Sequence, residues 1–212
     1  MPDLSWFGDH GFYPVDSTGV YDQAYFDKYA KMAATPMGRE ILNARMRLVD
    51  TFIDPRRSLV DVGIGCGDFV RARRCMVRLS MGEKINALGY DVNPAGVSWL
   101  VERNMFWDLS GEPVHAMTFW DSLEHIEAPD LFLAKAKAFV FVSIPIFEDE
   151  AHVRRSRHFR PTEHYHYFTR LGLVRYMEEL GFRMVLNDKR ETELGREDIE
   201  SFVFQRVGSL RA

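Results

Sequence analysis

Residues 59–67 read Leu-Val-Asp-Val-Gly-Ile-Gly-Cys-Gly. The apolar start predicts a short buried strand, and the glycines at every second position predict a sharp turn. Because glycine has no Cβ, the backbone of such a turn can approach a bound ligand closely. A dinucleotide-binding turn reads Gly-x-Gly-x-x-Gly, whereas here the third glycine comes one residue early, at Gly67, and Asp68 stands where that pattern needs glycine. The spacing therefore disfavours a nicotinamide oxidoreductase.

A second acidic residue follows one strand later. Residues 87–91 read Ala-Leu-Gly-Tyr-Asp, which predicts a strand that ends on Asp91, and Asn93-Pro94 predicts the start of the next helix. A carboxylate at this position can accept hydrogen bonds from both hydroxyls of a ribose, each worth about 1.5–3 kcal/mol when shielded from water. Glycines at a strand-to-helix corner can serve steric needs alone. The pairing of the glycine turn with Asp91 in one strand–helix–strand unit is what favours a nucleoside-binding site.

These two features together resemble a known family. An acid two residues before Gly-x-Gly-x-Gly resembles motif I of the class I S-adenosylmethionine (SAM) methyltransferases, and Asp91 stands where that family has its ribose-binding acid. The resemblance implies SAM as cofactor and S-adenosylhomocysteine as its product. It also implies an adenine-binding acid after the third strand, where Asp108 is the candidate, although a turn residue is an equal alternative there. The cofactor-binding residues that the resemblance implies are Asp61, Gly63, Gly65, Gly67, Asp91, Val92, Asp108 and Asp121.

The composition indicates a single domain. The chain has 212 residues, of which 46% are hydrophobic, and this is long enough for one well-buried domain. A formal net charge of -4 and a pI of about 6.0 give no general attraction for nucleic acid. The two cysteines lack metal-ligand spacing and fit a reducing compartment, and no apolar run is long enough to span a membrane. We expect a cytoplasmic protein without membrane contact.

Strand and helix signals alternate after the first thirty-four residues. Residues 1–34 are rich in aromatic side chains, so we expect an N-terminal cap in which Tyr21, Tyr25 and Tyr29 share a helical face and either pack in the core or close over the cofactor. Residues 35–212 are expected to form the SAM-binding domain, which begins with a helix start at Thr35-Pro36. Strands are expected at 58–62, 87–91, 104–107, 114–120, 138–144, 182–186 and 201–204. The alternation and the resemblance imply an α/β, Rossmann-like, doubly wound sheet of seven mostly parallel strands, with an antiparallel final strand and helices on both faces.

Residues 121–125 read Asp-Ser-Leu-Glu-His at the end of a predicted strand. They resemble the Asp-x-Leu-Glu-His segment of small-molecule SAM methyltransferases, including ubiquinone-type O-methyltransferases. In one interpretation, Glu124, His125 and His164 are catalytic residues, and His125 or His164 is the general base that removes a proton from the substrate. In the other, which looks like the metal site of small-RNA terminal ribose methyltransferases, a hard divalent metal such as Mg²⁺ or Mn²⁺ is held by Asp121, Glu124, His125 and His164. Helix capping by Glu124 and a buried, hydrogen-bonded His125 are the simpler alternatives.

Residues 152–166 contain four arginines and four histidines in a predicted long loop. The arginines either form a solvated face that pairs with the acids at 148–150 or bind an anionic acceptor; they are Arg154, Arg155, Arg157 and Arg160.

The sequence therefore predicts a SAM-dependent methyltransferase whose acceptor is an O- or N-nucleophile of a small molecule. The alternatives are metal-assisted methylation of a nucleic-acid ribose or a phosphate-bearing acceptor, and a noncatalytic SAM-binding module. A resemblance at the level of the fold does not identify the acceptor.

Overall fold

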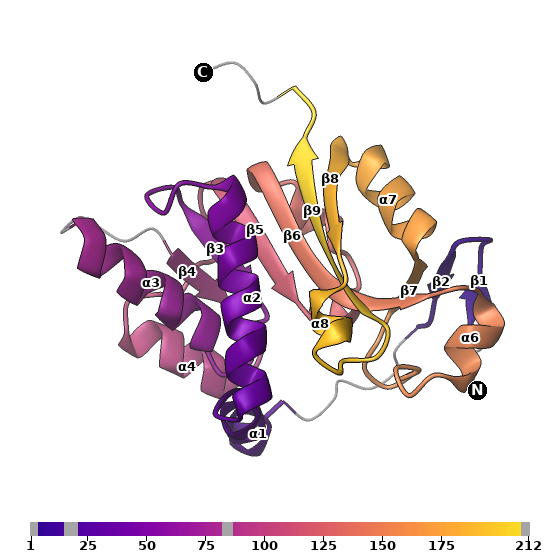
Figure 1. Cartoon of the computed structure of the whole chain (residues 1–212), viewed down its shortest axis with the longest axis horizontal. Helices are drawn as coiled ribbons and strands as arrows, with labels where there is room; N and C mark the ends of the chain where they lie inside the picture. Colours follow the sequence, from indigo (N-terminus) through magenta and orange to yellow (C-terminus); the bar gives the residue numbers. More distant parts are fainter. Residues whose placement is uncertain (1–3, 15–20, 82–86, 209–212) are drawn as a thin grey trace.

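The computed structural model describes residues 4–14, 21–81 and 87–208 (Figure 1). Residues 1–3 and 15–20 of the expected N-terminal cap lie outside the described residues. The strands are β1 (Ser5–Trp6), β2 (His10–Phe12), β3 (Leu59–Val62), β4 (Ala87–Tyr90), β5 (Val114–Trp120), β6 (Ala136–Phe147), β7 (His166–Thr169), β8 (Phe182–Asp188) and β9 (Ile199–Arg206). The helices are α1 (Gln23–Ala33), α2 (Pro36–Phe52), α3 (Asp68–Met81), α4 (Pro94–Glu102), α5 (Asp130–Leu133), α6 (Glu150–Arg155), α7 (Arg170–Glu179) and α8 (Arg190–Glu193), with a 3₁₀ turn at Leu123–His125.

The main sheet runs in the order β4-β3-β5-β6-β9-β8. β4, β3, β5 and β6 are parallel, and β9 is antiparallel to both of its neighbours. The chain steps outward from β3 to β4 and then returns to β5 on the other side of β3, which leaves a crevice at the carboxyl ends of these strands. The expected doubly wound sheet with an antiparallel final strand is confirmed.

One expected strand is wrong. Residues 104–107 form only an isolated parallel bridge between Gly89 and Phe106, at the edge beyond β4. Asn104 has a φ of 53° and its amide donates to the carbonyl of Val101, so this residue ends α4 instead of extending a strand.

Helices cover both faces of the sheet, as expected. Along β6, Val140 and Val142 pack in a core cluster with residues of α5 and α7, whereas Phe141 packs in a second cluster with Val49 of α2 and Phe69 of α3. Successive strand residues point to opposite faces, so this alternation places the helices of the two clusters on opposite sides. Figure 1 shows α2 and α3 separated from α7 by the sheet.

The far end of β6 carries a second, smaller group of strands. Ile146 and Phe147 pair with β7 instead of the main sheet, β2 pairs with β7, and β1 pairs with β2. Residues 10–12 therefore lie beside a strand that follows them by more than 150 positions. The long loop predicted at 152–166 is wrong at both ends, because His152–Arg155 belong to α6 and His166 begins β7.

Helices α1 and α2 meet at a tight corner. Thr35 caps α2, and its hydroxyl accepts a hydrogen bond from the Gly38 amide at 3.0 Å, as the Thr35-Pro36 signal predicts. A Cβ at Gly38 would lie 2.3 Å from the carbonyl oxygen of Met32, so glycine is what lets the end of α1 pack on α2. Phe26 is the buried residue of α1, and its ring lies 6.4 Å from that of Trp99 on α4.

None of the helices within the described ranges is long and apolar enough to cross a membrane.

Candidate functional site

A cavity of about 610 Å³ opens at the carboxyl ends of β3, β4 and β5. Its walls come from the glycine turn, the ends of β4 and β5, helices α1 and α2, and the segment before β9. This size is typical of small-molecule sites. The cavity brings together seven of the predicted site residues, which are Asp61, Gly63, Gly65, Asp91, Val92, Asp121 and His125. The predicted residues outside its lining are Gly67, Asp108, Glu124 and His164.

The glycine turn needs its glycines for two reasons. Gly63, Gly65 and Gly67 all have φ between 57° and 77°, which side-chain-bearing residues rarely adopt. A Cβ at Gly63 would lie 2.6 Å from the Cβ of Ser122, and a Cβ at Gly67 would lie 2.6 Å from the ring of Trp99. The side chains of Ser122 and Trp99 therefore cover the turn at Gly63 and Gly67. Gly65 faces the cavity, and a Cβ at Gly65 would lie 3.6 Å from the ring of Tyr29.

Asp61 lies at the floor of the cavity. Its side chain is fully buried and accepts a hydrogen bond from the Thr118 hydroxyl at 2.7 Å. Burial raises the pKa of Asp61 to about 7, and the Thr118 bond offsets this only in part. A cationic ligand group in the cavity would restore its charge.

Asp91 directly follows β4, one residue beyond the Tyr90 at which the strand ends. Its Oδ1 accepts from the Asn93 amide at 2.7 Å, which fixes the carboxylate at the start of α4. Burial raises its pKa, while backbone amides at 64, 92 and 93 act in the opposite direction. Asp108 differs: it is exposed, and its carboxylate accepts from the Ser110 amide at 2.7 Å, as in a turn.

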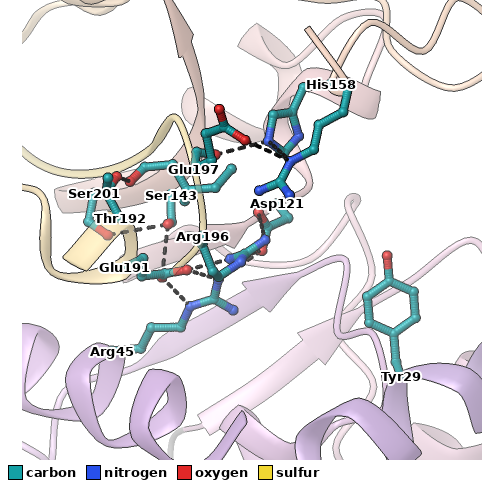
Figure 2. A network of polar contacts seen from close by, with 12 residues as sticks. Tyr29, Arg45, Asp121, Ser143, His158, Glu191, Thr192, Arg196, Glu197 and Ser201 are labelled. Carbon is teal, nitrogen blue, oxygen red and sulfur yellow. Dashed lines mark hydrogen bonds and ion pairs between the residues drawn. The ribbon is translucent and has the colours of Figure 1, made fainter. Parts of the chain in front are cut away.

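Asp121 belongs to a network of four charged side chains (Figure 2). Its carboxylate accepts from Arg45 at 2.8 Å and from Arg196 at 2.8 Å, and both guanidiniums also pair with the buried Glu191. Ser143 donates to Glu191 at 2.9 Å. Burial alone would raise the pKa of Asp121, but the Arg196 and Arg45 guanidiniums outweigh it and hold this pKa below its usual range. The two positive and two negative charges balance.

Glu124, His125 and His164 form a separate cluster. One potential ligand atom from each lies within 4.8 Å of the others, and the two imidazole rings are 4.4 Å apart. Among the described residues, Glu124 Oε2 and His125 Nδ1 are buried atoms without a hydrogen-bond partner. Asp121 does not join this cluster. It has a φ of 55° and precedes the 3₁₀ turn, so the single helical face expected for 121, 124 and 125 does not form.

Burial controls the protonation of this cluster. It raises the pKa of Glu124 well above its usual value, and the charge of Asp121 adds to the effect. It lowers the pKa of His125, and it lowers the pKa of His164 to about 2 with a further contribution from His125. Both imidazoles are therefore neutral near pH 7, and His125 is the member that reaches the cavity.

The arginine-rich segment is internally paired. Each of its four arginines lies within 4.0 Å of a carboxylate; the pairs are Arg154–Glu150 (2.6 Å), Arg155–Glu148 (3.9 Å), Arg157–Glu197 (3.7 Å) and Arg160–Glu163 (3.1 Å). Arg154 and Arg155 thus pair with the acids at 148–150, as one alternative expected, whereas Arg157 and Arg160 pair with acids outside that stretch.

Three charged residues of the site were not predicted from the sequence. Arg45 lies within the apolar stripe of α2, and a charged residue inside such a stripe indicates a buried partner or a site. Arg196 and Glu191 follow β8 and carry no local signal. The tyrosines predicted to share a helical face line the cavity instead of packing in the core.

Comparisons with known proteins agree with this geometry. A family model described as a methyltransferase domain matches residues 30–187, well over half of the chain. A search of curated protein sequences finds no match.

Solved structures share the fold at low sequence identity. Magnesium protoporphyrin IX methyltransferase from Synechocystis PCC 6803, with bound S-adenosylhomocysteine, has a TM-score of 0.62 and 11% identity over 88% of this chain and 96% of its own. A SAM-dependent methyltransferase from Aquifex aeolicus has a TM-score of 0.60 and 15% identity, over 86% and 98%. The 1,6-didemethyltoxoflavin-N1-methyltransferase from Burkholderia thailandensis has a TM-score of 0.54 and 13% identity, over 97% and 99%.

The glycine turn and the sheet order are thus accompanied by a family match that spans the cavity-forming strands β3, β4 and β5. The chain belongs to the methyltransferase-domain family, and it is a class I SAM-dependent methyltransferase.

Proposed function

We propose that this enzyme transfers the methyl group of SAM to an O- or N-nucleophile of a small molecule. The observation that carries this proposal is that the glycine turn, Asp91 and His125 all line one cavity of about 610 Å³. Such an arrangement lets one cavity hold the cofactor and a proton acceptor side by side. Holding the reactants in line can provide about 7–11 kcal/mol of the rate enhancement.

In this proposal the glycine turn and Asp91 hold the cofactor. Asp91 accepts hydrogen bonds from the ribose hydroxyls, Val92 lies beside the adenosine, and Asp61 faces a cationic group of SAM. Gly63 and Gly67 fix the shape of the turn, and Asp121 acts through its arginine partners. The exposed, turn-forming geometry of Asp108 removes the support for an adenine contact there.

His125 is the proposed general base. The nucleophile attacks the methyl carbon, the bond from this carbon to sulfur breaks, and S-adenosylhomocysteine leaves. The proton of the nucleophile passes to the imidazole of His125, which lines the cavity. Glu124 and His164 lie behind His125 and position its ring.

A small acceptor fits better than a nucleic acid. The paired arginines at 154–160 leave little free positive charge for a phosphate backbone. The proteins from Synechocystis and Burkholderia thailandensis are named for porphyrin and toxoflavin substrates, which are small molecules.

The direct test is a search for labelled products. The enzyme is incubated with methyl-labelled SAM and a cell extract, and the products are separated into small-molecule and macromolecular fractions. We expect label in the small-molecule fraction. Label confined to RNA or protein would contradict the proposal.

Replacing His125 with alanine is expected to lower kcat by about 10²-fold, the lower end for general-base catalysis, because alignment supplies most of the rate in a displacement at sulfonium. SAM affinity is expected to stay nearly constant. Steady-state kinetics with the labelled acceptor measure both quantities. His115→Ala is the control, since His115 lies near the start of β5 and outside the cavity lining; equal rates for the two variants would exclude His125 as the base.

The pKa of Asp61 predicts a pH dependence of cofactor binding. Because this pKa is about 7 instead of its ordinary value near 4, much of the carboxyl is protonated at pH 6, and the ammonium group that SAM and S-adenosylhomocysteine share binds the ionised form better. We expect the affinity for S-adenosylhomocysteine to rise between pH 6 and 8. In Asp61→Asn, calorimetric titrations should give a weaker affinity that is flat over this range, and a persistent slope would assign the dependence to another group.

A divalent metal at Glu124, His125 and His164 is the second candidate role for this cluster. The two buried atoms without partners fit a metal ligand set, and one carboxylate with two imidazoles suits a transition ion such as Mn²⁺ better than Mg²⁺. A bound ion there would act as a Lewis acid toward a substrate oxygen.

This metal hypothesis predicts that the protein binds MnCl₂ in calorimetry and unfolds at a higher temperature in its presence. His164→Ala should abolish both effects, whereas His158→Ala, which removes a histidine of the neighbouring segment, should leave them intact. Absence of Mn²⁺ binding to the chelator-treated parent would leave His125 as a base only.

A further inference from the structure

We divide the lining of the cavity into two groups of residues, a cofactor half and an acceptor half, and Tyr29 borders both because its ring lies over Gly65 of the glycine turn. The cofactor half contains the glycine turn and the end of β4. The acceptor half lies toward the α1–α2 corner, and we define it by Tyr25, Tyr29, Met37, Ile41, Leu42 and Trp120. In the function proposed above, on which this inference rests, the methyl acceptor occupies this second half.

The acceptor half uses an apolar helix face that the core buries only in part. Met37, Ile41 and Leu42 continue the apolar stripe of α2 toward its N-terminus. Val49, at the other end of the stripe, is fully buried in the core, whereas Met37 is 48% exposed and lines the cavity. Apolar side chains gathered in a cavity are typical of a site for an apolar ligand.

Aromatic rings form the rest of the acceptor half. The rings of Tyr25 and Tyr29 are 4.9 Å apart, and the Tyr25 hydroxyl donates to that of Tyr29 at 3.2 Å. The Arg45 guanidinium covers one side of the Trp120 ring at 5.0 Å. Gly38 lets the end of α1 pack closely on α2, and Tyr25 and Tyr29 of α1 line the same cavity as Met37 and Ile41 of α2. Flat rings pack well against such aromatic edges and faces.

The acceptor half offers no free positive charge among the described residues that line it. Arg45 and Arg196 are the lysine or arginine residues among the described lining of the whole cavity, and Asp121 and Glu191 balance them in one closed network. An anionic acceptor would have to draw a guanidinium away from two carboxylates, one of which is almost fully buried. Leaving a buried charge without its partner is costly.

We infer that the methyl acceptor is an uncharged aromatic molecule, and that the faces presented by α1 and α2 select it. A phenol or a nitrogen heteroaromatic has the required combination of a flat apolar body and one O- or N-nucleophile. The apolar body contacts Met37, Ile41 and Leu42, and the ring lies against Tyr25 and Tyr29.

Three matched probes test this inference on the protein saturated with S-adenosylhomocysteine. They are 2-naphthol, 2-naphthyl phosphate and decahydro-2-naphthol, and their affinities are measured by ligand-observed NMR. We expect 2-naphthol to bind at least about tenfold more tightly than either of the others. Equal or tighter binding of the phosphate overturns the uncharged character, equal or tighter binding of the saturated alcohol overturns the aromatic character, and failure of 2-naphthol to bind overturns the inference as a whole.

Two variants locate the binding site. Ile41→Glu and the more exposed Met37→Glu each put a negative charge on the apolar face and should weaken 2-naphthol binding at least about tenfold. Met184→Glu, on the exposed edge strand β8, is the matched control. The affinity for S-adenosylhomocysteine should stay constant in all three. If the parent protein does not bind S-adenosylhomocysteine, the result counts against the proposed function. If both α2 variants bind 2-naphthol as tightly as the parent does, the result counts against this inference alone.

Discussion

Replacing Glu191 with alanine is expected to lower the free energy of unfolding by about 3–5 kcal/mol, the largest effect predicted for this protein. Glu191 is 1% exposed and pairs with both Arg45 and Arg196 (Figure 2). Without it, two guanidiniums share the single carboxylate of Asp121, and one buried positive charge is left without compensation. The melting temperature should fall by roughly 6–20 °C, which calorimetry or circular dichroism can measure.

Glu193 provides a control on the same short helix. Its side chain is 63% exposed and pairs with Arg190 at 3.1 Å. Surface pairs of this kind contribute little, so Glu193→Ala should change the free energy of unfolding by less than about 1 kcal/mol. Similar losses for the two variants would show that the buried network does not stabilise the fold as argued.

Replacing Asp91 with alanine is expected to weaken SAM binding by about 1.5–4 kcal/mol, or roughly 10- to 900-fold. The carboxylate is held at the end of β4 by the Asn93 amide, so its orientation exists before the ligand arrives. Its removal takes away a charged acceptor for the ribose hydroxyls and leaves the glycine turn intact. Calorimetric titration with SAM and S-adenosylhomocysteine measures the loss.

Asp108→Ala is the matched control for this experiment. Both residues are acids that follow β4 in the chain, but Asp108 is exposed and bonds within its own turn. Its removal should leave SAM affinity unchanged. If Asp108→Ala weakens SAM and Asp91→Ala does not, the assignment of the ribose-binding acid is wrong.

The sequence predicts best where one short segment carries its own structural signal. The Thr35-Pro36 helix start depends on neighbouring residues only, and so does the positive φ of the glycine turn, although distant side chains also pack closely on the turn; the structure has both where they were expected. The strand predicted at 104–107 fails because Asn104 adopts a left-handed conformation that ends α4. The apolar character of residues 105–107 predicts a strand, but it does not show that the preceding residue ends a helix. The pairing of β2 with β7 likewise had no local signal, because its partners are far apart in the chain.

The sequence by itself determined the cofactor: the early third glycine, Asp61 and Asp91 fall within one strand–helix–strand unit, so local backbone geometry already brings them to one edge of the sheet. Only the tertiary structure decided which groups face the acceptor. Arg45 and Glu191 are 146 positions apart. Glu191 pairs with both Arg45 and Arg196, and together with Asp121 it balances the charge of these two cavity arginines. Charge balance of this kind depends on contacts between distant segments, and neither residue's own neighbourhood encodes it.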